Sequence, residues 1–177
     1  MKREVEIPED VEIKLEGKRV RIKSGDEEVV KKLDHPLLDL EVEDDRIIIK
    51  SLKENKKVDS VSRTFKSKIK NAIKGVHEGF DYRLKVIYRH FPMEVSVKGD
   101  RLVVSNFLGE KADREAEILE GVNVQVEDGE ILVRGADKER VGQTAANIEG
   151  RMQAPSAKDR RVFEDGIYIV EKPEMEG

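Results

Sequence analysis

Two stretches decide the fold: VEIKLEGKRVRIKS at residues 11–24 and MEVSVKGDRLVVSN at residues 93–106. In both, apolar residues alternate with polar ones at matching positions, and Gly17 aligns with Gly99. Such alternation is typical of a half-buried strand, and a glycine between two such runs is typical of a hairpin turn. Each stretch therefore predicts a β-hairpin, and their similarity indicates an internal repeat.

The repeat continues beyond the hairpin and keeps its order. LEVEDDRIIIKS at residues 40–51 matches VQVEDGEILVRG at residues 124–135, and both are followed by apolar residues spaced three and four apart. That spacing is typical of an amphipathic helix, which we expect over about 58–76 in the first copy and 138–151 in the second. Asp137 is placed to cap the second helix.

The ends of the two copies also match. GFDY at residues 79–82 resembles DGIY at residues 165–168, which adds a fourth matching block in the same order. The sequence as a whole predicts an α+β protein of two tandem similar domains that arose by internal duplication, residues 1–80 and 81–177. Each domain is expected to be a mostly antiparallel sheet packed against one helix.

Composition excludes several classes of protein. The 177 residues contain no Cys, which excludes a disulfide scaffold, a Cys-ligated zinc site and a thiol nucleophile. No apolar run approaches the roughly 18 residues of a membrane span, and the first residues show no apolar stretch of the signal-peptide kind. The histidines have no spacing that would pair them on a metal. We therefore predict a cytoplasmic protein that needs no membrane, metal, cofactor or small-molecule substrate.

Charge is distributed unevenly along the chain. The net charge is −4, yet residues 58–91 carry 8 basic and 3 acidic groups, and residues 151–161 carry 4 and 1. Phosphate binding depends on local rather than total charge, so both stretches are candidate contact regions. The basic side chains on the exposed face of the first helix are expected to be Arg63, Lys66, Lys68, Lys70 and Lys74. A solvated helix face is the favoured interpretation, and a second contact face toward phosphate or a partner is the alternative.

Two further segments stand out. SNFLGEK at residues 105–111 follows a predicted strand, and its Phe107 and Leu108 either tuck under the sheet or form a contact surface. RMQAPSAKDRR at residues 151–161 combines a proline, small residues and basic residues, as do extended segments that follow RNA phosphates. We predict that residues 153–160 are mobile in the free protein because few apolar side chains anchor them.

Four motifs carry a resemblance to a known family: FPMEV at 91–95, NFLGEK at 106–111, VGQTAANIE at 141–149 and RVFEDGIYIVEKP at 161–173. Over essentially its whole length, the chain resembles the archaeal type of the large-subunit ribosomal protein L-six family. The resemblance implies two similar α+β domains, in agreement with the repeat, and a structural role in the ribosome without catalysis. It also implies binding to large-subunit rRNA near the sarcin–ricin loop. Neighbouring large-subunit ribosomal proteins would be partners, with translational GTPases docking nearby.

The resemblance assigns most of the rRNA contact to the second domain. The contact residues it implies are Asn106, Lys111, Arg114, Gln143, Asn147, Arg151, Lys158, Arg160, Arg161, Tyr168 and Lys172. Arg and Lys would neutralise phosphates, while Asn and Gln would bond to sugar or base edges. Gly109 and Gly166 are expected to let the backbone approach the RNA closely.

The residues themselves leave two other functions open. A free-standing tandem α+β module could bind protein through exposed sheet edges, and this binding would be less sensitive to salt than RNA binding. An enzyme with paired carboxylates has little support. Glu43-Asp44 and Glu127-Asp128 both fall in predicted turns rather than in a cleft.

Overall fold

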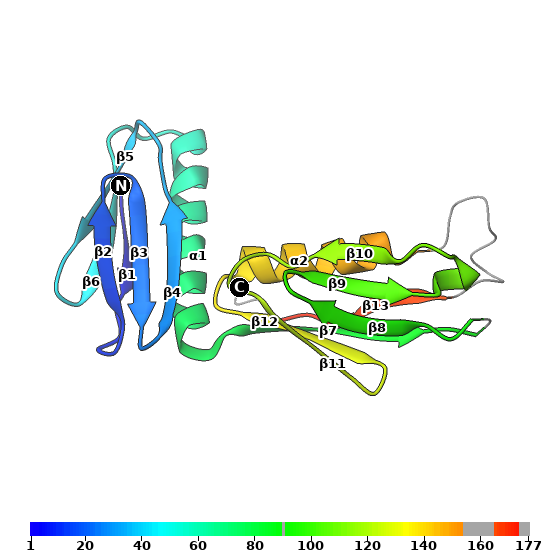
Figure 1. Ribbon diagram of the computed structural model, residues 1–177. Helices are drawn as coiled ribbons and strands as arrows, with labels where there is room; N and C mark the ends of the chain where they lie inside the picture. The colour runs from blue at the N-terminus through cyan, green and yellow to red at the C-terminus, as the bar shows by residue number, and fades with distance from the viewer. Residues whose placement is uncertain (90, 154–164, 174–177) are drawn as a thin grey trace. The chain divides into compact units, whose positions relative to one another are not determined.

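The computed structural model describes residues 1–89, 91–153 and 165–173 (Figure 1). The chain divides into two compact units, Met1–Gly79 and Phe80–Gly177. Within each unit the described strands pair antiparallel, and one helix packs against the sheets. The predicted α+β architecture, with one helix in each half, is confirmed.

The first unit contains two three-stranded sheets, in the orders β2-β3-β4 and β1-β6-β5. The two-residue turn between β2 and β3 places Gly17 at φ 62°, a left-handed conformation that glycine adopts without steric cost. The first predicted hairpin is therefore present, whereas β1 was not predicted. The elements are β1 (Lys2–Glu6), β2 (Glu12–Glu16), β3 (Arg19–Ser24), β4 (Glu27–Lys32), β5 (Leu38–Val42), β6 (Arg46–Ser51) and α1 (Lys56–Glu78).

The second unit contains a three-stranded sheet, β8-β9-β10, and a four-stranded sheet, β11-β12-β7-β13. Gly99 takes the same φ of 62° between β8 and β9 that Gly17 takes in the first unit, so the two repeated stretches fold alike. The elements are β7 (Phe80–Ile87), β8 (Glu94–Lys98), β9 (Arg101–Ser105), the short 3-10 helix η1 (Phe107–Gly109), β10 (Arg114–Glu117), β11 (Asn123–Glu127), β12 (Glu130–Gly135), α2 (Lys138–Arg151) and β13 (Gly166–Glu171).

The match between residues 79–82 and 165–168 has a different meaning in the structure. Phe80 begins the second unit, and β7 pairs with β12 in the way that β1 pairs with β6. β7 is thus the counterpart of β1 and closes nothing in the first unit. β13 joins the other side of β7 and adds a fourth strand. The two similar segments therefore take different places in the sheets, because the place of a strand depends on pairing between residues distant in sequence.

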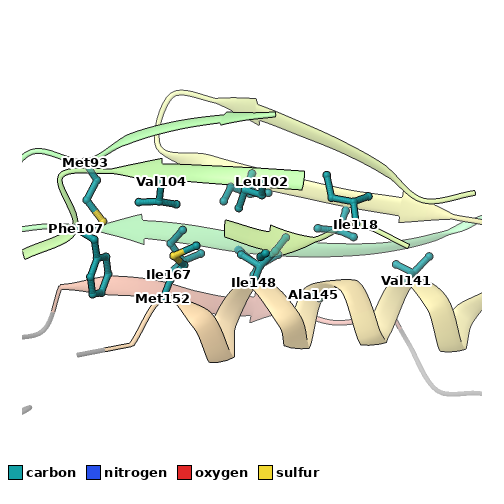
Figure 2. Close-up of a cluster of buried hydrophobic side chains, with 14 of the residues drawn as sticks. Met93, Leu102, Val104, Phe107, Ile118, Val141, Ala145, Ile148, Met152 and Ile167 are labelled. Atoms are coloured by element: carbon teal, nitrogen blue, oxygen red, sulfur yellow. The ribbon is translucent and has the colours of Figure 1, made fainter. Parts of the chain in front are cut away.

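The core of the second unit lies between its sheets and α2 (Figure 2). The consecutive residues Leu102, Val103 and Val104 of β9 are all buried, so both faces of this central strand are covered. α2 turns an apolar stripe towards the sheets. The labelled members of that stripe are Val141, Ala145, Ile148 and Met152. Asp137 caps the helix as predicted, because its side chain accepts a hydrogen bond from the Glu139 N–H.

The end of α2 is packed tightly against the start of β13. The Met152 carbonyl accepts the N–H of Ile167 at 3.1 Å. A Cβ on the neighbouring Gly166 would lie 2.8 Å from the same carbonyl oxygen and 3.1 Å from the Tyr168 ring. Only a glycine therefore allows β13 to approach the helix this closely, since the backbone carbonyl cannot give way like a flexible side chain.

We predict that Gly166→Ala lowers the free energy of unfolding by about 1–3 kcal/mol, because the added methyl group overpacks this contact. The matched control is Gly150→Ala on α2, where a new Cβ meets open space. That change should stabilise the chain by about 0.5–1 kcal/mol through helix propensity. Urea denaturation of both variants checks the pair, and equal midpoints would contradict the packing argument.

Candidate nucleic-acid interface

Polar side chains of α2 lie along the free edge of β10. We call this contact the α2–β10 seam, and it consists of Gln143, Asn147 and Arg151 of α2 and Arg114 of β10. The three α2 residues are spaced four apart and so share one face of the helix. β10 is an edge strand, and an uncovered edge presents unpaired backbone groups. The seam supplies donors for two backbone carbonyls of this edge and leaves the side chains of Gln143 and Arg151 exposed.

The hydrogen bonds of the seam run in sequence along the helix. Gln143 Nε2 donates to Asn147 Oδ1 at 2.8 Å, and Asn147 Nδ2 donates to the Glu117 carbonyl at 3.3 Å. One turn further on, Arg151 Nε donates to the Glu115 carbonyl at 3.2 Å. These predicted contact residues are therefore brought together, and their first role is to hold α2 on the strand.

The turn between β9 and β10 has an unusual backbone. Asn106, Leu108 and Gly109 take φ values of 61°, 50° and 76°. Left-handed conformations are costly for a side chain such as that of Leu108 and persist only where the surroundings enforce them. Phe107 and Leu108 are both buried, which settles the open question of their position: they tuck under the sheet. Their burial holds the turn in its strained form.

Two contacts from the β7–β8 connection support this turn. Asn106 Nδ2 donates to the Pro92 carbonyl at 2.9 Å. A Cβ on Gly109 would lie 3.1 Å from the ring of Phe91. Gly109 and Gly166 were expected to let the backbone approach RNA, but in both the space that a Cβ would need is taken by the protein itself. Internal packing is therefore sufficient to explain both glycines.

The β7–β8 connection is also tied to the start of β13. The carboxylate of Asp165 is fully buried, and its Oδ1 accepts the backbone N–H of Arg89 at 3.1 Å. Near the end of α2, the Met152 carbonyl accepts the backbone N–H of Ile167 in β13. The β9–β10 turn, the β7–β8 connection, the end of α2 and the start of β13 thus lie at one end of the second unit (Figure 1).

The predicted contact residues divide by position. Asn106, Arg114 and Arg151 lie at this end of the unit, and the exposed Lys111 follows its strained turn. Lys172 lies at the opposite end of β13, because Gly166 pairs with Ile87 and Glu171 with Arg83. Tyr168 is half-buried on β13 beside Gly166. Lys158, Arg160 and Arg161 lie outside the described residues, as do residues 154–160 of the segment that we predicted to be mobile.

The basic face of α1 is only partly solvated. Arg63 and Lys70 are exposed, whereas Lys66, Lys68 and Lys74 are half-buried. Arg63 pairs with Asp59 at 2.9 Å. Asp59 also accepts a hydrogen bond at 2.6 Å from Arg3 on β1, and this bond is the main reason why the pKa of Asp59 is lowered. Asp59 therefore anchors α1 to β1, and Arg63 of the predicted second contact face pairs with the same carboxylate.

Sequence reasoning missed the residues that organise the site. Asp165 and Glu149 bond to backbone N–H groups of Arg89 and Ile169, while Glu110 binds Arg114. All three lie within or beside the quoted motifs, but their residue type alone does not distinguish a structural carboxylate from a solvated one. Among the described residues, no group of His, Asp and Glu side chains is placed to hold a metal. No described helix is long and apolar enough to span a membrane.

Comparisons with known proteins agree in identifying one family. A family model described as Ribosomal protein L6 matches residues 91–166. The chain is 43% identical over 172 residues to the large ribosomal subunit protein uL6 of Methanococcus vannielii. This match spans 97% of this chain and 94% of that protein. It is 44% identical over 172 residues to the protein of the same name from Methanothrix thermoacetophila, with 96% of each chain covered.

For the strained turn, we predict that Asn106→Ala destabilises the chain more than Asn106→Gly does. Both variants lose the bond to the Pro92 carbonyl, but only Ala adds the left-handed backbone penalty of about 1–2 kcal/mol. Urea denaturation gives the two free energies of unfolding. Equal values for Ala and Gly would show that the turn stores no such strain.

For the α1 anchor, we predict that Asp59→Asn destabilises the chain at pH 7 and that the difference from the wild type shrinks in acid. A carboxylate with a lowered pKa stabilises the fold above its unfolded pKa, about 3.9, and this stabilisation is lost as pH falls through the folded pKa. Thermal midpoints between pH 7 and pH 2 would measure it. The control is Asp26→Asn in an exposed turn. A difference between the wild type and Asp59→Asn that persists at pH 2 would contradict the ion-pair account.

Proposed function

This chain belongs to the ribosomal protein L6 family, and on that premise we propose that it binds large-subunit rRNA near the sarcin–ricin loop, through its second unit. As a member of the family it is a structural protein of the large ribosomal subunit and not an enzyme. The finer proposal concerns which face of the chain meets the RNA, and which part of the subunit it stabilises. We place the bound rRNA beside the site where translational GTPases dock.

The observation that carries the proposal is the convergence of four segments at one end of the second unit. The strained β9–β10 turn, the β7–β8 connection, the end of α2 and the start of β13 meet there. Residues 151–161, with four basic groups and one acidic group, begin at this end. A rigid, protein-supported end next to a basic stretch suits RNA, which proteins recognise largely by shape and by phosphate contacts.

The proposed contact residues fall into two groups. Lys111 and Arg151 are exposed side chains of the described part, and Lys158, Arg160 and Arg161 belong to the basic segment between α2 and β13. All five are cations suited to phosphate oxygens. Gln143 and Asn147 lie along the helix leading to this end, and their amides would bond to sugar or base edges once the seam has placed them.

The first unit takes a secondary role in this proposal. Its basic α1 face would meet a neighbouring ribosomal protein or RNA, but Arg63 is already paired with Asp59 and three of the five basic side chains are half-buried. The alternative of a protein-interaction module with open sheet edges has less support in the second unit. There, the β10 edge is occupied by side chains of α2.

A titration across salt concentrations tests the proposal, with an rRNA fragment that contains the sarcin–ricin region. We expect tight binding whose logarithm falls linearly with the logarithm of salt concentration. The variant Arg151/Lys158/Arg160/Arg161→Ala should bind at least about a hundredfold more weakly, with a flatter slope, because each lost phosphate contact removes about 0.7–0.9 from the slope.

The matched control removes the same number of positive charges from the first unit: Arg63/Lys66/Lys70/Lys74→Ala. It should keep the affinity within a few-fold of the wild type. Equal losses in both variants would mean that net charge alone drives binding. Absence of binding by the wild type would contradict the proposal. Equal affinity of the wild type for the sarcin–ricin fragment and for an unrelated RNA of the same length would also contradict it.

A further inference from the structure

Arg114 is one of the residues that the family resemblance assigns to rRNA, but its hydrogen bonds point elsewhere. A guanidinium has five N–H donors and no acceptor. Nε and Nη2 donate to the two carboxylate oxygens of Glu110, at 2.7 Å and 3.4 Å. Nη1 donates to the carbonyls of Arg151 and Gln153, at 2.8 Å and 3.0 Å. These contacts use four of the five donors inside the protein.

The flat face of the guanidinium is occupied as well. Its central carbon lies 4.2 Å from the centre of the Phe107 ring, and that ring is fully buried. The side chain of Arg114 is only 20% exposed. Glu110 neutralises the charge of the guanidinium, and Phe107 covers one of its faces. Few of its N–H donors and little of its surface are therefore available to a phosphate.

The groups that Arg114 joins come from three parts of the site. Glu110 ends the strained turn, Arg114 itself begins β10, and the two carbonyls belong to the last residue of α2 and to the chain just beyond it. Carbonyls at a helix C-terminus lack partners within the helix, and a cation there is favoured by the helix dipole. A single side chain therefore fixes the end of α2 to the turn that precedes Lys111.

We propose that Arg114 is a positioning residue for rRNA binding, which holds Lys111 and Arg151 in their relative places and makes no phosphate contact of its own. The inference rests on the proposed function and refines its contact list. Lys cannot replace Arg here. An ammonium is a compact charge with three donors, and it cannot span a carboxylate and two carbonyls while it stacks on a ring.

The distinguishing experiment compares Arg114→Lys with Arg114→Gln in the salt titration, at a temperature where both variants are folded. We expect both to lose affinity to a similar extent, tenfold or more, and to share the same salt slope, because both misplace Lys111 and Arg151 equally. The matched control on the same loop is Lys111→Gln, which should flatten the slope by about 0.7–0.9. Wild-type affinity for Arg114→Lys together with a flatter slope for Arg114→Gln would show that the charge at this position binds phosphate, and would overturn the proposal.

A second measurement needs no RNA. The Met152 N–H bonds to the Ile148 carbonyl, and the Ile167 N–H bonds to the Met152 carbonyl, so both report on the end of α2. Hydrogen exchange at these two amides should accelerate at least tenfold in Arg114→Lys, while the Gly79 amide at the end of α1 keeps its rate. Unchanged exchange at Met152 and Ile167 would overturn the positioning role.

The two measurements together separate failure of this inference from failure of the proposed function. If the wild type binds no rRNA, the proposed function fails, and the exchange rates still decide whether Arg114 holds the end of α2. If Arg114→Lys lowers the thermal midpoint but leaves rRNA affinity unchanged in the folded protein, Arg114 is merely structural and the proposal is wrong.

Discussion

The organisation of the second unit depends on how the last turn of α2 is held. On one side, the carbonyl of Met152 receives the N–H of Ile167, at a contact so close that Gly166 has no room for a side chain. On the other side, Arg151 and Arg114 tie the same turn to β10. The apolar stripe of the helix supplies the burial energy, but these polar contacts decide where the helix ends and which segments meet there.

The same contacts show how a binding surface and a fold can share residues. Asn147 and Arg151 look like RNA-contacting residues because amides and guanidinium groups bond well to sugars and phosphates. In the structure they also satisfy backbone carbonyls that an edge strand would otherwise leave unpaired. A side chain that is held in this way loses less conformational freedom when a ligand binds, which favours affinity through preorganisation.

Much of the fold could be predicted from the sequence because its signals are local. The hairpin at Gly99 and the helix after Asp137 follow from alternation, spacing and a capping residue, and both were placed correctly. The strand β1 was missed because its residues bury little but Val5 and pair with β6, far along the chain. The hydrogen bonds of Arg114 could not be predicted from the sequence for a related reason. An arginine that binds carbonyls and an arginine that binds phosphate are the same residue in a sequence, and only the tertiary structure distinguishes them.

The partly covered edge of β10 also affects the free protein before it is assembled into a ribosome. A newly made ribosomal protein must stay dispersed until its RNA is available, and an open strand edge would invite pairing with the edge of another copy. Because α2 supplies amide and guanidinium donors to the Glu117 and Glu115 carbonyls of that edge, fewer backbone acceptors of this strand remain for pairing with another copy. The seam thus makes this one edge a poorer site for pairing between unassembled copies.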